Sequence, residues 1–147
     1  MLSSGDEIGQ LNDYGYKNNP DIAIDSRYLH RSTFNWKNAE LRNQKGTVQN
    51  RIWEGLQQME QLRRENPCFG EKAYVTTWDT CRVSVFAVRR TTAENELVCL
   101  ANFSEEGQMA CLPTLEGEYT DLFTGEILNL KSVWMASYQY CWCIRNR

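Results

Sequence analysis

The chain has 147 residues, of which 41% are apolar and 12% aromatic, so it holds enough hydrophobic side chains for a packed core. Its net charge of −3 provides no basic surface, which excludes nucleic acid as a probable partner. No apolar run approaches the roughly 18 residues that cross a membrane. The start, residues 1–4, lacks the basic and apolar regions of a signal peptide, so we expect a cytoplasmic protein.

Residues 5–46 form a polar segment without helical or strand periodicity. The segment is long by the statistics of loops, and loops of this length are generally functional or disordered. Its aromatic residues argue against disorder: Tyr14, Tyr16, Tyr28, Phe34 and Trp36. We therefore interpret it as a loop that builds a site.

An amphipathic helix is predicted from Thr47 to Glu65. Thr47 is a suitable N-cap, and Pro67 ends the helix after Asn66. Apolar residues recur at spacings of three and four, which places them on one side of the helix: Val48, Ile52, Leu56, Met59 and Leu62. This apolar stripe requires a partner surface.

After Pro67 the hydrophobic period changes to two, which indicates strands separated by turn residues. Eight strands are predicted, namely Ala73–Trp78, Arg82–Arg90, Glu96–Phe103, Gln108–Leu112, Tyr119–Phe123, Glu126–Leu130, Val133–Ala136 and Tyr138–Ile144. Short strands about ten residues apart with no helix between them are typical of an antiparallel β-sandwich.

Four of the six cysteines lie in strand-like runs, where a thiol behaves as a small hydrophobic group. Cys141 and Cys143 are two residues apart and share one face of a strand. With His30 as the single histidine, we expect neither a metal site nor a cofactor. Reduced thiols are the expectation, and a disulfide-stabilised secreted domain is the alternative.

Trp78, Trp134 and Trp142 occupy alternating strand positions. Large aromatic residues at such positions usually belong to the core. The alternative is a face on which sugar rings stack.

The polar segment contains Gly5-Asp6-Glu7-Ile8-Gly9, Leu11-Asn12-Asp13, Asp25-Ser26-Arg27 and His30-Arg31, and the β half contains Asn102-Phe103-Ser104-Glu105 and residues 121–126. Together these motifs resemble the amylosucrase branch of the α-amylase family, glycoside hydrolase family 13. The similarity covers essentially the whole chain. The loop motifs are specific to the branch, whereas the motifs in the β half are typical of the whole family.

The resemblance implies the end of a (β/α)8 barrel, comprising the loop and last helix, followed by the antiparallel β-sandwich called domain C. Residues 1–66 would supply the end of strand eight, the loop after it and the eighth barrel helix. Residues 72–147 would form domain C. The apolar stripe of the helix would then face an upstream barrel domain, and the polar loop would lie on the barrel face that carries active sites.

The resemblance implies an α-glucoside-active retaining enzyme whose catalytic carboxylates lie upstream of this chain. We therefore assign no catalytic residue here and expect no turnover from this part alone. Arg27 matches an arginine that closes the glucose pocket by pairing with an aspartate, and a guanidinium suits that role. Asp25, His30 and Asp13 are the other candidate substrate-binding residues.

The branch pattern Asp-Asp-Ser-Arg-Trp-x-His-Arg-Pro is replaced here by residues 24–32, which begin with Ile24 and end with Ser32. Arg27 is retained while its surroundings differ. The sequence therefore leaves open whether the substrate is sucrose or an α-glucan, and whether the reaction is transfer or hydrolysis. The alternative from another class is a non-catalytic β-sandwich module that binds glucan or stabilises a partner domain.

Overall fold

The computed structural model describes residues 5–146, and Met1–Ser4, where the barrel-strand end was expected, lie outside the described residues. Two compact units divide at Gln61 and Leu62. Within the described range, no helix combines the length and the apolar character that crossing a membrane requires.

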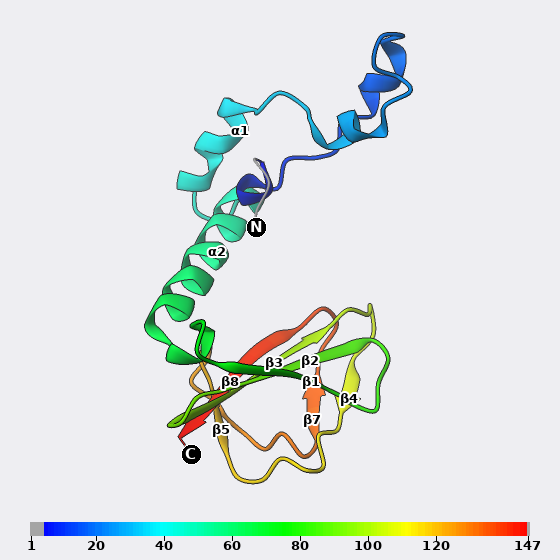
Figure 1. The fold of residues 1–147 in the computed structure, drawn as a ribbon. Helices are drawn as coiled ribbons and strands as arrows, with labels where there is room; N and C mark the ends of the chain where they lie inside the picture. The colour runs from blue at the N-terminus through cyan, green and yellow to red at the C-terminus, as the bar shows by residue number, and fades with distance from the viewer. Residues whose placement is uncertain (1–4, 147) are drawn as a thin grey trace. The chain divides into compact units, whose positions relative to one another are not determined.

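The second unit is built from two antiparallel sheets (Figure 1). The larger sheet has the strand order β1-β2-β3-β8-β5-β6, and the smaller one pairs β4 with β7. The strands are β1 (Tyr74–Trp78), β2 (Val85–Thr91), β3 (Asn95–Asn102), β4 (Gln108–Ala110), β5 (Tyr119–Asp121), β6 (Ile127–Leu128), β7 (Val133–Met135) and β8 (Tyr140–Asn146). Each falls within or overlaps a predicted strand, so the antiparallel β half is confirmed.

The hydrophobic core lies between the two sheets. Val98 and Leu100 of β3 are buried, as are Cys141 and Cys143 of β8. Met135 of β7 completes this set from the smaller sheet. The two cysteines therefore share the inner face of β8, as their spacing predicted, and Cys141 Sγ lies 4.0 Å from Met135 Sδ.

Buried polar side chains connect the sheets and shape the turns. The Asn102 amide donates to the carbonyls of Glu106 at 2.8 Å and Ala136 at 2.9 Å, and thus ties the end of β3 to the end of β7. Asp121 accepts from the Thr124 hydroxyl at 2.9 Å and from the backbone N–H of Trp142 at 3.1 Å. The two motifs that resembled domain C are thus turn-forming sequences held by a buried amide and a buried carboxylate.

A fully buried carboxylate, Glu96 on β3, lies among cationic side chains of the larger sheet. Arg89 donates to it from Nε at 3.0 Å and from Nη2 at 2.9 Å. The Tyr119 hydroxyl and Arg145 Nη2 complete the set at 2.9 and 3.2 Å. Burial alone would raise the pKa of Glu96, but these hydrogen bonds outweigh it and hold the pKa below its ordinary value.

The predicted helix is α2, Val48–Glu65 (Figure 1). Thr47 caps it as expected, since its Oγ1 accepts from the backbone N–H of Asn50 at 3.1 Å. The apolar stripe remains partly open, with Val48 60% exposed. Gly9 has φ +60° and lies against Ile52, where a Cβ would approach the Cδ1 atom to 2.6 Å.

The polar segment contains more helical structure than its lack of periodicity suggested. It includes the α-helix α1, Trp36–Glu40, and short 3₁₀ helices at Asp6–Ile8, Tyr14–Asn18, Ser26–His30 and Leu41–Asn43. Three of these helices begin at Asp or Asn caps, whose side chains accept backbone N–H groups: Asp13, Asp25 and Asn35. Elements of three to five residues are too short to produce a hydrophobic period.

Candidate functional site

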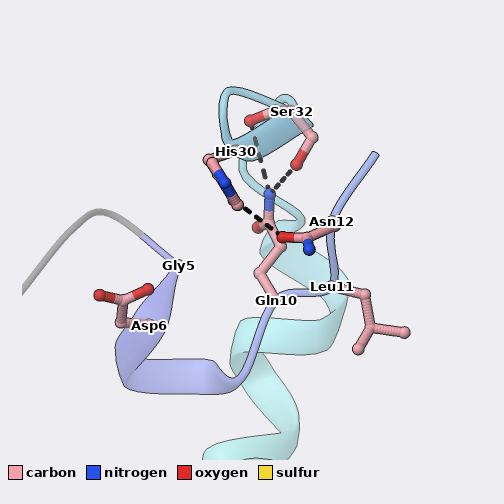
Figure 2. A pocket seen from close by; sticks show the side chains of 7 residues that line it. All are labelled: Gly5, Asp6, Gln10, Leu11, Asn12, His30 and Ser32. Atoms are coloured by element: carbon pink, nitrogen blue, oxygen red, sulfur yellow. Dashed lines mark hydrogen bonds between the residues drawn. The ribbon is translucent and has the colours of Figure 1, made fainter. Parts of the chain in front are cut away.

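A hollow of about 150 Å³ lies in the first unit. Its lining comprises Gly5, Asp6, Gln10, Leu11, Asn12, His30 and Ser32. Figure 2 shows the Gln10, Asn12, His30 and Ser32 side chains converging, while Leu11 is directed away from them. The polar part of the lining thus comes from two stretches of chain about twenty residues apart.

Gln10 joins the two ends of the polar segment. Its Nε2 donates to the hydroxyl of Ser32 and to the carbonyl of Thr33, the latter at 3.2 Å. Its Oε1 accepts the backbone N–H of Asn35 at 3.1 Å. One side chain therefore makes hydrogen bonds to three successive parts of the segment's far end and closes the intervening residues into a loop.

His30 is one of the four predicted site residues, and it lines the hollow. Its Nδ1 lies 2.9 Å from Asn12 Oδ1, so Nδ1 carries the proton and donates. This bond is the second link between the two stretches (Figure 2). The other ring nitrogen, Nε2, is left for a hydrogen bond to a ligand hydroxyl.

Asp13, a second predicted residue, lines a neighbouring hollow of about 550 Å³ instead. Its Oδ1 accepts the backbone N–H of Gly15 at 2.8 Å and caps the 3₁₀ helix Tyr14–Asn18. Its own N–H donates to the Leu29 carbonyl at 2.9 Å. Asp13 thus links the two sides of the loop through its backbone N–H. One oxygen of its carboxylate caps the 3₁₀ helix Tyr14–Asn18.

Asp25 and Arg27 are brought together by the structure, but they do not line either of these hollows. Arg27 Nη2 lies 2.6 Å from Asp25 Oδ2, and Nε lies 2.8 Å from Oδ1. Asp25 also caps Ser26–His30 through the backbone N–H of Arg27. The guanidinium hydrogen bonds lower the pKa of Asp25 to about 2. Arg27 is 70% exposed, so its outer edge can still donate to a ligand.

Sequence reasoning did not assign Gln10, Asn12 and Ser32 to the site. Their only signal was membership of the motifs at residues 5–13 and 24–32, where Ser32 replaces the proline of the branch pattern. Proline has no hydroxyl, so the Gln10–Ser32 side-chain bond belongs to this chain's variation of the motif. Amide and hydroxyl partners 22 residues apart leave no local pattern in a sequence.

The lining is suited to binding hydroxyl groups rather than to bond cleavage. Amide, imidazole and hydroxyl groups both donate and accept, as recognition of a sugar requires. Glu7 is engaged in a turn, since its Oε2 accepts the Gly5 N–H at 2.8 Å. Within residues 5–146, no cluster of three or more His, Cys, Asp or Glu side chains has the geometry for a metal ion.

No protein-family model matches the chain. Solved structures do share its fold. AmyP in complex with maltose superposes with a TM-score of 0.72 at 19% identity, over 95% of this chain and 30% of that one. Trehalose-6-phosphate hydrolase (TreA) of Bacillus licheniformis gives 0.57 at 16% identity, over 83% and 21%. A MutB mutant in complex with glucose gives 0.55 at 15%, over 64% and 18%.

These matches establish the fold of this chain, and their coverage is informative. The chain spans less than a third of the length of each of these structures. The AmyP match covers 95% of the chain, so it includes residues on both sides of the division at Gln61 and Leu62.

Proposed function

We propose that this chain is the C-terminal portion of a retaining, α-glucoside-active enzyme of the amylosucrase branch of the α-amylase family. The observation that carries the proposal is the AmyP match, which spans nearly the whole chain but under a third of the larger protein. AmyP, MutB and TreA are glycoside hydrolase family 13 enzymes. The branch-specific loop motifs of residues 5–31 add the finer assignment.

On this proposal the second unit is domain C, and residues 1–66 are the end of the catalytic barrel. The half-open stripe of α2 supports this, because Val48 is 60% exposed although it continues an apolar face. A partner domain upstream in the same polypeptide would cover that stripe. Burial of each such side chain is worth about 1.5–3 kcal/mol, which is the driving force for docking.

The loop closed by Gln10 would form part of the substrate pocket. The catalytic carboxylates would come from upstream barrel strands, so this chain would supply binding groups alone. Arg27 would contact a sugar hydroxyl or a carboxylate of an earlier loop, with Asp25 fixing its orientation through a bidentate pair. His30 Nε2 would accept a hydroxyl, and Asp13 would hold the loop in shape.

Sucrose and α-glucans are the proposed substrates. The neighbours were crystallised with maltose in AmyP and with the substrate sucrose in MutB. The six cysteines are free thiols, which is typical of a reducing compartment, and we propose that the enzyme acts in the cytoplasm.

The test is an assay of the full-length parent with sucrose and with maltose, followed by Arg27→Ala. We expect release of glucose or fructose by the parent, and a loss of about tenfold or more in kcat/KM for the variant, because the charge-assisted hydrogen bond from Arg27 would be lost. Lys17→Ala, an exposed cation elsewhere in the loop, is the matched control. A parent inactive on every α-glucoside tested would refute the proposal.

A further inference from the structure

The three tryptophans of the β half have different surroundings. The Arg89 guanidinium lies 4.9 Å from the centroid of Trp78 and covers that ring. Trp142 packs against Phe69 at 4.7 Å and Phe123 at 4.9 Å between centroids. Trp134 of β7, in contrast, is 60% exposed on the outer side of the smaller sheet. The expectation that all three belong to the core is therefore wrong for Trp134, and also for Trp142, which lies on the face of β8 opposite the buried Cys141 and Cys143.

The ring of Trp134 is held in place although it is exposed. Its six-membered part lies against the backbone of Gly107, where an added Cβ would come within 2.7 Å of Cη2 and 3.0 Å of Cε2. Met109 is its cross-strand partner on β4 and is itself 39% exposed. A ring supported by backbone and flanked by a thioether loses little conformational entropy when a ligand stacks on it.

We propose that Trp134, Gly107 and Met109 form a carbohydrate-binding platform for α-linked glucan, separate from the loop of residues 5–35. This platform rests on the proposed function, because aromatic stacking alone does not select α-linked glucose. An indole ring presents an apolar face to the C–H face of a sugar.

The size of the surface favours a sugar over a protein partner. A tryptophan side chain offers at most about 250 Å², and a specific protein interface needs about 800 Å² on each partner. The exposed ring of Trp134 therefore suits the face of a sugar ring rather than a protein partner. In a glucan-active enzyme such a site would hold a polymer near the protein while its end is processed.

The test is native affinity electrophoresis of the 147-residue chain in gels containing amylose, with hydroxyethylcellulose gels for comparison. We expect amylose to retard the wild type. Trp134→Ala should raise the apparent Kd about tenfold, and Trp134→Phe, which keeps a ring, should retain part of the binding. Gly107→Ala is the sharper variant, because Trp134 stays present while the new Cβ displaces its ring; Gly107 has no left-handed φ, so the backbone accepts alanine.

Tyr74→Ala is the matched control, since Tyr74 is an aromatic residue that is 72% exposed but lies on β1 of the larger sheet. It should be retarded like the wild type. The platform is refuted if Trp134→Ala and wild type are retarded equally, or if amylose does not retard the wild type. An active parent with no retardation refutes the platform alone. Retardation only by hydroxyethylcellulose refutes it as well and also counts against an α-glucoside-active parent.

Discussion

Gln10 and Ser32 are 22 residues apart in the chain, yet the amide of the first donates to the hydroxyl of the second. This bond, with those from Gln10 to Thr33 and Asn35, closes the loop that carries Asp13, Asp25, Arg27 and His30. Gln10 thus holds the candidate site in shape and also contributes a polar group to its lining.

Gln10→Ala should loosen the loop without unfolding the β half. It deletes the acceptor of the Asn35 N–H and the donor to Ser32 and Thr33, each bond being worth about 0.5–1.5 kcal/mol. Amide hydrogen exchange of Asn35 should accelerate about tenfold or more. Gln57→Ala, exposed on α2, is the control. Unchanged exchange in the Gln10 variant would show that other contacts close the loop.

The Asp25–Arg27 pair predicts a pH response of the loop. Hydrogen bonds from Arg27 lower the pKa of Asp25 to about 2, so the folded loop favours the ionised carboxylate. The stabilisation of the folded loop by the ionised Asp25 carboxylate is complete above the ordinary pKa of 3.8. It is lost as the pH falls from there through about 2. Carboxyl NMR titration should show the low pKa, and Arg27→Gln should return it toward 3.8. An ordinary pKa in the wild type would contradict the pairing.

Glu96→Gln should destabilise the β half by about 3 kcal/mol, because Arg89 and Arg145 would keep their charges without the carboxylate that pairs with them. Since the folded pKa of Glu96 is lowered, the stabilisation is present above the ordinary value of 4.5 and disappears as pH falls through the folded pKa. Urea unfolding followed by tryptophan fluorescence measures both effects. Glu105→Gln, at an exposed position, should change stability by less than about 0.5 kcal/mol. Equal effects of the two substitutions would disprove the role of Glu96.

Asn102→Ala should cost about 2–4 kcal/mol of unfolding free energy. It removes the donor to the buried Ala136 carbonyl and the acceptor of the Ser104 backbone N–H, while the Ser104 hydroxyl keeps its bond to the Glu106 carbonyl. The same urea experiment measures the loss. Asn129→Ala is the control, because Asn129 is exposed and its side chain accepts the Lys131 N–H in a surface turn. A loss no larger than that of the control would show that the sheets are joined by apolar packing alone.

The cysteines should react with Ellman's reagent in a fixed order. Exposed Cys81 should react first, while buried Cys68, Cys141 and Cys143 should react only on unfolding. Burial raises the pKa of Cys99 to about 12, so its thiolate is scarce at neutral pH. Cys81→Ser should remove the fast phase. Fewer than six thiols in denaturant would support the disulfide-stabilised alternative.

The β half was predictable because its strands alternate and its turns carry Gly, Asn and Asp. The period of two placed Cys141 and Cys143 on one face, and the Thr47 cap fixed the start of α2. The exposure of Trp134 was not predictable, because alternation shows that successive side chains face opposite sides of a strand but not which side faces the core. The structure shows the side directly, because Trp134 is 60% exposed between the buried Val133 and Met135.

The candidate site was predicted in part. Asp25 and Arg27 were singled out together, and the structure places them in one ion pair. Three residues that line the hollow were missed, namely Gln10, Asn12 and Ser32. A hydrogen bond between side chains about twenty residues apart produces no periodic pattern in the sequence. The resemblance supplied the candidate residues. The hydrogen bonds of the structure show which of them line the same hollow.

The central claim is that this chain is the C-terminal portion of a larger α-glucoside-active enzyme. The most direct measurement is the size of the native protein, detected in an extract with an antibody against residues 72–147. The account predicts a polypeptide at least three times the 17.2 kDa of this chain, because the chain spans 30% of AmyP and less of the other matches. A native product of about 17 kDa would contradict it.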